Sequence, residues 1–191
     1  MSNLPELTQE YIQKFVMPAH GNLAVVQEML ANDPRLLDAM YEPWGETALG
    51  AASHVGNRPI AEYLLEQGAK LTIYTAAMLG NQDDVAAFLV NDPDLINSGG
   101  AHNIPLMFHA ALSGDLALMQ FLAEKGNTQT ADNALHIAAN RGDTAMTQWL
   151  LARGADVNTT NFQDMTPLQI AEAQEQAEVA ALLQSYGATG T

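Results

Sequence analysis

The chain of 191 residues contains no cysteine, and only 7 lysines and arginines stand against 22 aspartates and glutamates. Without cysteine there can be no disulfide, no thiolate metal site and no thiol nucleophile. The formal charge of −15 at pH 7 repels phosphate backbones, whose attraction normally dominates nucleic-acid affinity, so nucleic acid is not expected as a partner. The same charge favours a partner that carries basic residues.

Long apolar runs and targeting signals are also missing. No stretch approaches the roughly 18 uninterrupted apolar residues that cross a membrane, although 48% of the residues are hydrophobic, which is enough for a core. Residues 1–7 show no basic region followed by an apolar run, so no signal peptide is expected. We expect a single domain over residues 1–191, in a soluble cytoplasmic protein that is a monomer or a weak homodimer and makes no membrane contact.

The common short motifs of catalysis are absent. The sequence has no Gly-x-Gly-x-x-Gly, no Walker-type Gly-Lys-Ser/Thr, no Gly-x-Ser-x-Gly and no His-Glu-x-x-His. We therefore expect no enzymatic activity, no catalytic residues and no cofactor.

What the sequence does contain is a repeat. A glycine that would end a short helix recurs at spacings of 24 to 35 residues, preceded by small residues and followed by a second apolar helix. Such a unit cannot bury its apolar face alone, so its copies are expected to stack, with the glycine in a left-handed conformation at the helix end. The glycines are Gly21, Gly56, Gly80, Gly114 and Gly142, with Glu175 at the matching place of a last, degenerate copy.

Three stretches carry a family resemblance. Residues 45–52 (Gly-Glu-Thr-Ala-Leu-Gly-Ala-Ala), 133–139 (Asn-Ala-Leu-His-Ile-Ala-Ala) and 164–171 (Asp-Met-Thr-Pro-Leu-Gln-Ile-Ala) resemble the Gly-x-Thr-Pro-Leu-His-x-Ala-Ala stretch of ankyrin repeats. The resemblance covers residues 8–188, and Thr47 and Thr166 are expected to cap helices. It implies an all-α repeat solenoid of stacked helix-turn-helix units with β-hairpin fingers. About six units, including degenerate terminal caps, are expected at approximately 8–40, 41–71, 72–99, 100–128, 129–160 and 161–188.

The repeats are irregular. Residues 69–75 leave no room for a full hairpin before the next helix, and the link at 126–132 is shortened too. Two near-identical inserts, 32–38 and 91–97, begin Asn-Asp-Pro and are expected to cap the preceding helix and turn the chain.

The register predicts a binding face. In ankyrin repeats the two residues before each turn glycine, and the fingers, face the concave groove; here these positions hold aromatic, Met, Leu, His and Arg residues, which are typical of binding hot spots. The main interpretation is therefore a non-enzymatic module that binds a protein or peptide partner, with a basic partner favoured. Met78 and Leu79 could instead be covered because the hairpin before them is missing. The expected partner-binding residues are His20, Tyr41, Trp44, Glu46, His54, Val55, Met78, Leu79, His102, Leu112, Arg141, Phe162 and Met165.

The five histidines divide into two groups. His136 falls on the position where the family uses imidazole to brace backbone between repeats, and His109 reads as a hydrogen-bonded core histidine. His20 and His54 precede turn glycines, so stacked units could bring them near each other and near His102 on a neighbouring finger. No metal is assigned to them. The alternative function is a small-molecule or metal site near Trp44, His54 and His102, where the missing hairpin would open a pocket.

Overall fold

A computed structural model describes residues 6–129 and 132–189. The expectation about a signal peptide rests partly on residues 1–5, and the shortened link includes residues 130–131; both stretches lie outside the described residues.

The described residues contain six pairs of α-helices. The first helices of the pairs are α1 (Gln9–Val16), α3 (Ala48–His54), α5 (Ile73–Met78), α7 (Leu106–Ser113), α9 (Asp132–Arg141) and α11 (Pro167–Ala173). The second helices are α2 (Leu23–Asn32), α4 (Arg58–Glu66), α6 (Gln82–Asn91), α8 (Leu116–Glu124), α10 (Thr144–Ala152) and α12 (Ala177–Ser185).

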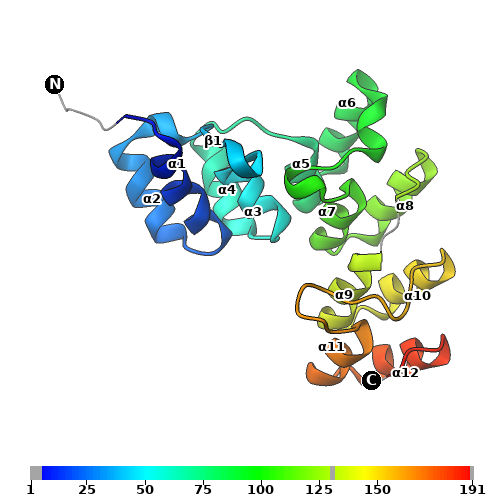
Figure 1. Cartoon of the computed structure of the whole chain (residues 1–191). Coiled ribbons are helices and arrows are strands. Elements are labelled where there is room, and N and C mark those ends of the chain that lie inside the picture. Colours follow the sequence, from blue (N-terminus) through cyan, green and yellow to red (C-terminus); the bar gives the residue numbers. More distant parts are fainter. Residues whose placement is uncertain (1–5, 130–131, 190–191) are drawn as a thin grey trace.

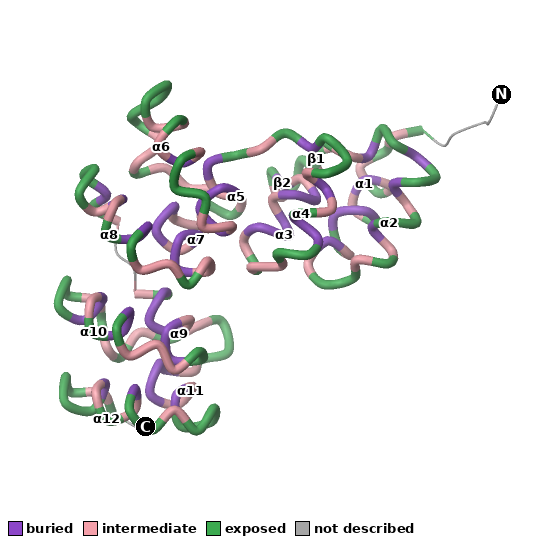
Figure 2. Tube along the Cα trace, turned by 180° about the vertical axis from the view of Figure 1, so that it is seen from behind, coloured by how far each residue is buried: buried purple, intermediate pink, exposed green. Residues whose placement is uncertain are grey.

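The pairs stack into a solenoid that turns a corner at α5 to α8, so its outline resembles an L (Figure 1). Helices α3, α7, α9 and α11 lie along the inside of the bend, and α6, α8, α10 and α12 lie along its outside. The first helices pack on one another in succession, and Figure 2 shows the buried residues concentrated along them. The prediction of an all-α repeat solenoid is confirmed.

The turn glycines mostly behave as their register predicts. Gly56 and Gly142 have φ angles of 73° and 69°, in the left-handed region where a glycine has no steric cost. Glu175 adopts the same conformation with φ 57° despite its side chain. Gly21 differs, with φ −171°, so the expectation of a left-handed turn there is wrong. The reason is that the 3₁₀ helix η1 (Met17–His20) continues α1 and ends the first helix of that unit differently.

Threonine caps begin several of the first helices. The side chain of Thr47 accepts a hydrogen bond from the backbone N–H of Gly50, and Thr166 does the same for Gln169 in a full capping box. Both predicted caps are therefore confirmed, and Thr72 adds an equivalent cap at α5. Asparagine or aspartate caps the second helices in the same way, at Asn22, Asn57, Asn81, Asp115 and Asp143.

The best-formed finger precedes α3. Strands β1 (Met40–Tyr41) and β2 (Glu46–Thr47) pair antiparallel, with Tyr41 opposite Glu46, around the 3₁₀ helix η3 (Glu42–Trp44). Gly45, with φ 60°, turns the chain back into β2. A second finger is reduced to one bridge between Gly99 and Pro105, with the 3₁₀ helix η5 (Ala101–Asn103) between them.

The missing hairpin leaves a boundary between two apolar cores. One core joins α1 to α4, and the other runs from α5 to α12. The boundary passes through α5, because Ile73 belongs to the second core while Met78 packs with the first. At this junction the buried hydroxyls of Ser53 and Thr75 hydrogen-bond at 2.8 Å, joining α3 to α5 directly.

The two inserts form matching 3₁₀ turns, η2 (Pro34–Leu36) and η4 (Pro93–Asn97). Asp33 and Asp92 are the C-cap residues of α2 and α6, and their N–H groups donate to the carbonyl oxygens of Met29 and Phe88, which confirms the expected capping of the preceding helix. Their side chains accept hydrogen bonds from the backbone N–H groups of Arg35 and Asp94 and so begin the 3₁₀ turns. Asp33 is buried and pairs with the Arg35 guanidinium at 2.6 Å. The hydrogen bond from Arg35 lowers the pKa of the Asp33 carboxyl.

Candidate functional site

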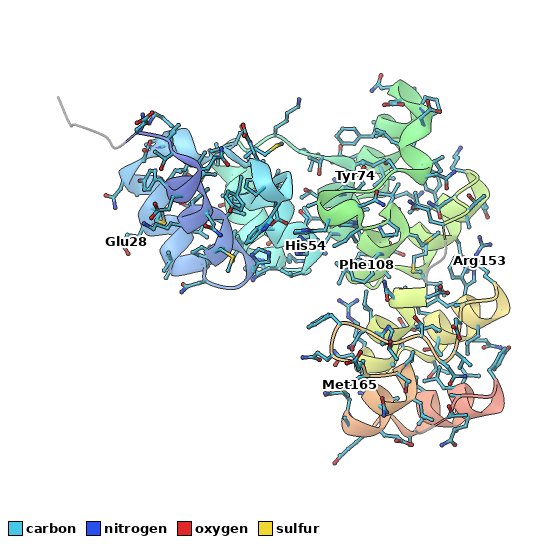
Figure 3. The ribbon with its side chains drawn as sticks, viewed as in Figure 1. Glu28, His54, Tyr74, Phe108, Arg153 and Met165 are labelled. Atoms are coloured by element: carbon cyan, nitrogen blue, oxygen red, sulfur yellow. The ribbon has the colours of Figure 1, made fainter. Side chains whose placement is uncertain are left out.

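A groove of about 870 Å³ lies on the inside of the bend. Its lining comes from α7, α9 and α11 and from the finger at residues 160–165, and it reaches Val55 at the end of α3. Figure 3 shows His54, Phe108 and Met165 along this inner side of the solenoid. We call it the C-terminal groove. Its lining residues are Val55, Ile104, Pro105, Phe108, Leu112, Asn133, His136, Ile137, Asn140, Arg141, Thr160, Asn161, Phe162, Gln163, Met165, Ile170, Ala173 and Gln174.

The C-terminal groove combines apolar surface with amide side chains. Phe108, Ile137 and Phe162 contribute apolar surface, and Phe162 is 93% exposed at the tip of its finger. Amides come from five positions along the lining: Asn133, Asn140, Asn161, Gln163 and Gln174. An amide both donates and accepts hydrogen bonds, so this row can pair with the N–H and C=O groups of an extended backbone.

The finger beside the groove is held in place by backbone hydrogen bonds. His136 Nε2 lies 3.1 Å from the Met165 carbonyl oxygen, as expected for a histidine that braces backbone between repeats. Burial lowers the pKa of His136, so the imidazole is neutral and donates to that oxygen. The Asn161 side chain accepts from the N–H groups of Gln163 and Met165 at 2.9 and 3.1 Å. The finger therefore presents Phe162 from a fixed turn.

Arg141 connects two repeats instead of extending freely into the groove. Its guanidinium donates to the carbonyl oxygens of Ala111 and Leu112, at 3.2 and 2.7 Å, across the gap from α9 to α7. The side chain remains exposed at its edge, so it can contact a ligand while holding the groove floor together.

A different kind of site lies in the N-terminal units, next to the end of the groove at Val55. Glu46 on β2 is only 1% exposed, and three imidazoles surround its carboxylate. His54 Nδ1 lies 2.8 Å from Oε1, His102 Nε2 lies 3.6 Å from Oε1, and His20 Nε2 lies 3.8 Å from Oε2. We call these four residues the N-terminal cluster. Single ligand atoms of His20, Glu46 and His54 all lie within 4.8 Å of one another, close enough for one metal ion.

Aromatic rings cover the exposed side of the N-terminal cluster. The Trp44 ring lies 6.2 Å from that of His102, and Tyr41 packs edge-on against Trp44 with ring centres 4.8 Å apart. His54 lies between the other two imidazoles, with ring centres 5.0 Å from His20 and 5.3 Å from His102.

The structure thus divides the sequence-predicted residues into two groups. His20, Tyr41, Trp44, Glu46, His54 and His102 gather at the N-terminal cluster, whereas Val55, Leu112, Arg141, Phe162 and Met165 line the C-terminal groove.

Two expected surface residues are buried. Met78 is 1% exposed because it packs into the first core at the missing hairpin. Its expected place on the concave surface is therefore wrong, and the alternative that it is covered there is confirmed. Glu46 is buried because β2 turns its side chain toward the histidines, and it cannot contact a protein partner directly. Leu79 is half-buried, and its carbonyl oxygen accepts a hydrogen bond from Arg58 at 2.9 Å.

The repeat register did not predict several of the residues that line the groove. Phe108 and Ile137 lie one turn before the two positions that precede each glycine, and Asn161 and Gln163 flank Phe162 in its finger. The helical period carries the signal for the first pair, since residues three or four apart share a face.

His109 is the core histidine that its sequence position predicts. It is 1% exposed, and its Nδ1 lies 3.0 Å from the Pro105 carbonyl oxygen. Burial lowers its pKa to about 4, with a smaller contribution from repulsion by His54. It is therefore neutral at pH 7 and donates to Pro105.

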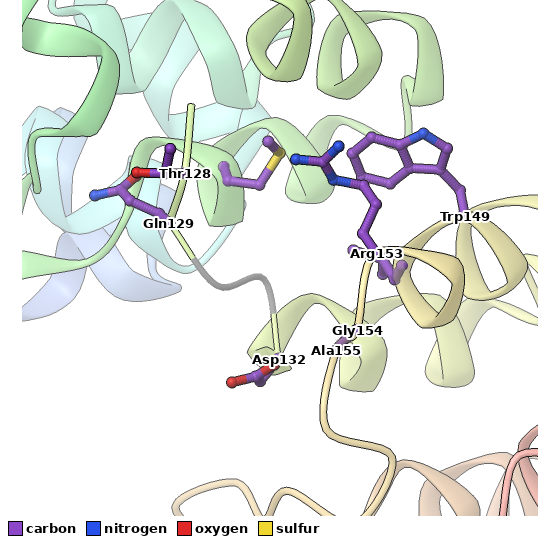
Figure 4. A pocket seen from close by; sticks show the side chains of 9 residues that line it. Thr128, Gln129, Asp132, Trp149, Arg153, Gly154 and Ala155 are labelled. Atoms are coloured by element: carbon purple, nitrogen blue, oxygen red, sulfur yellow. The ribbon is translucent and has the colours of Figure 1, made fainter. Parts of the chain in front are cut away.

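A small cavity of about 100 Å³ lies elsewhere, beside the shortened link (Figure 4). Thr128, Gln129 and Asp132 line one side, and the Arg153 guanidinium lies 4.9 Å from the Trp149 ring on the other. We assign it no function, because residues 130–131, between two of its lining residues, lie outside the described part of the chain.

Comparison with known families agrees with this architecture. A family model described as ankyrin repeats (3 copies) matches residues 73–161 and 106–190, and one for a single ankyrin repeat matches residues 44–76. The chain belongs to the ankyrin-repeat family. Ankyrin repeats are in general protein–protein interaction modules, and the family is typically non-enzymatic. Among the described residues of this ankyrin-repeat protein, no helix is long and apolar enough to span a membrane.

Proposed function

We propose that this ankyrin-repeat protein is a non-enzymatic module that binds an extended peptide segment of a partner protein in the C-terminal groove. The observation that carries the proposal is the combination of a row of amides with an apolar surface ending in Phe162, which is 93% exposed. The amides pair with the peptide backbone, and an apolar side chain of the peptide packs between Phe108, Ile137 and Phe162. The cytoplasmic location stays a prediction from the sequence.

Charge favours a peptide with basic residues beside its apolar anchor. The chain as a whole carries a formal charge of −15, which attracts cations over a distance of about 8 Å at physiological salt. Acidic residues also adjoin the lining: Asp164 lies between Gln163 and Met165, and Glu175 follows Gln174. Arg141 brings a single positive charge to the lining, and these two carboxylates outweigh it.

The finger and helices that line the groove are also held in place before a ligand binds. His136 and Asn161 fix the finger, and Arg141 ties α9 to α7, so little side-chain ordering is left for the binding step. Fixed geometry raises affinity by lowering this entropic cost.

The test is a displayed library of extended peptides with one apolar residue flanked by lysine or arginine, followed by fluorescence polarisation of the selected peptides. Phe162→Ala should weaken binding by about tenfold or more, the effect of an aromatic hot spot. Val90→Ala is the matched control, because Val90 is an apolar residue 82% exposed on α6, outside the groove. Equal affinity for the two variants would contradict the proposal.

A further inference from the structure

The N-terminal cluster contains a buried carboxylate without the partners that burial normally requires. Among the described residues, neither oxygen of Glu46 accepts a hydrogen bond. His54 Nδ1 approaches Oε1 to 2.8 Å, but the ring N–H direction does not point at the oxygen, and Nδ1 makes no hydrogen bond either. A buried anion without hydrogen bonds is strongly unfavourable unless a positive charge lies beside it.

The tautomer of His20 indicates where that positive charge belongs. Its Nδ1 lies 3.0 Å from the Met17 carbonyl oxygen, which can only accept, so Nδ1 carries the proton. In the neutral ring Nε2 then holds a lone pair, and this atom faces Glu46 Oε2 at 3.8 Å. Two lone pairs that face each other repel unless a cation lies between them. A carbonyl that fixes the remote nitrogen of an imidazole is also the usual support of a metal-ligating histidine.

The distances fit a tetrahedral zinc site. Zinc bonds of 2.0–2.2 Å to nitrogen and oxygen place neighbouring ligand atoms about 3.4 Å apart. His54 Nδ1 lies 2.8 Å from Glu46 Oε1 and His20 Nε2 lies 3.8 Å from Oε2, and these separations bracket that value. Imidazole and carboxylate together select a borderline transition metal over calcium or magnesium, which prefer oxygen ligands.

The backbone of His102, beside the three ligands, adds a further observation. His102, in η5, has φ 55° and ψ 22°, a left-handed conformation that is uncommon for a residue with a side chain. Such strain persists only where the surroundings determine it, and it is concentrated at functional sites. This conformation turns the imidazole toward Glu46 from the finger of a later repeat.

We propose that the N-terminal cluster binds one Zn²⁺ ion through His20, His54 and one oxygen of Glu46. Three protein ligands leave one position of the zinc tetrahedron open. The ion joins η1, β2 and the end of α3, so it ties the first unit to the finger and first helix of the second unit. None of these ligands lines the C-terminal groove, and the test does not depend on peptide binding.

The experiment titrates ZnCl₂ into chelator-treated full-length protein by calorimetry. One ion per chain should bind, and Glu46→Gln, which keeps the shape but removes the charge, should weaken affinity by about 100-fold. Glu62→Gln is the matched control, because Glu62 is an exposed carboxylate on α4 and should leave affinity unchanged. His20→Ala, at a partly exposed ligand, gives a second test if the buried substitution lowers folding.

A spectroscopic readout separates coordination from simple stabilisation. CoCl₂ added to the Trp149→Phe variant should give the visible absorption of tetrahedral Co²⁺ and quench Trp44, whose ring lies 6.2 Å from that of His102. MgCl₂ should do neither. No saturable Zn²⁺ binding, or binding that Glu46→Gln and His20→Ala leave unchanged, would overturn the proposal.

Discussion

The five histidines of this chain occupy two contrasting environments. Within the first helices of their units, α7 and α9, His109 and His136 lie beside the carbonyl oxygens of Pro105 and Met165. Beside the β1–β2 finger, His20, His54 and His102 converge on one buried carboxylate. The same side chain therefore serves as a neutral brace in one region and as part of a charged cluster in the other.

The contrast follows from how the fingers are built. The finger beside the C-terminal groove accepts its hydrogen bonds through backbone atoms, so a neutral imidazole is sufficient. The finger at β1–β2 turns a glutamate inward, and a buried carboxylate requires cationic partners. The cluster beside the first core is therefore held by charge, whereas the finger of the groove beside the second core is held by neutral hydrogen bonds.

The largest effect expected from this contrast is a pH dependence of folding stability at His109. His109 has its pKa lowered to about 4, whereas the unfolded chain titrates near 6.5. Because the pKa is lower in the folded state, the unfolded state binds more protons than the folded state below about pH 6.5. The free energy of unfolding therefore decreases as the pH is lowered from about 6.5 to about 4. The loss should be about 3 kcal/mol, mainly from burial, with Tyr74 and His54 as the neighbouring titratable groups.

Urea unfolding of the wild type and of His109→Gln at pH 7 and pH 4 measures this difference. Glutamine keeps a donor for the Pro105 carbonyl oxygen but does not titrate. The wild type should lose about 3 kcal/mol more than the variant over this range. Parallel curves for the two proteins would show that His109 is not buried in neutral form.

Zinc should produce the next largest effect, confined to the other region. At a free concentration 100 times its dissociation constant, an ion that binds only the folded state stabilises it by about 2.7 kcal/mol. Hydrogen exchange should slow by about 100-fold in α3, which belongs to the first core, and much less in α11, which belongs to the second. Equal protection of both helices would mean that the two cores unfold together.

The sequence predicts the fold well because local signals set it. Thr47 and Thr166 cap helices as expected, and Gly56 and Gly142 adopt the left-handed turn that their register requires. The stacking of short units then follows, since each needs its neighbours to bury its apolar face. The match of the family models to residues 44–190 reflects the same recurring signals.

The sites were predicted less well, because burial depends on packing between units. The register suggested that His20, His54 and His102 come close, and they do. It placed Glu46 on an open face, although the pairing of β2 with β1 turns that side chain inward. It left open whether Met78 is exposed or covered, because sequence spacing does not show which core fills the space of a missing hairpin.

A matched pair of histidine substitutions should give a smaller effect. His136→Ala removes the donor to the Met165 carbonyl oxygen and should cost about 2 kcal/mol, the cost of an unsatisfied buried group. In metal-free protein, His102→Ala should change stability by less than about 0.5 kcal/mol, because that side chain is exposed. Chemical denaturation in the presence of a chelator measures both. A larger loss for His102→Ala would assign its imidazole a structural role without metal.

The smallest effect compares a regular turn with the degenerate first one. Gly142 has φ 69°, and a Cβ there would also contact the amide of Gln176, so Gly142→Ala should cost about 1 kcal/mol. Gly21 has φ −171° and open space around it, so Gly21→Ala should be neutral or stabilise by up to about 1 kcal/mol through the unfolded state. Thermal unfolding of the two variants measures the difference. Equal losses would mean that Gly21 also needs a left-handed turn, and that the first unit ends its helix as the regular repeats do.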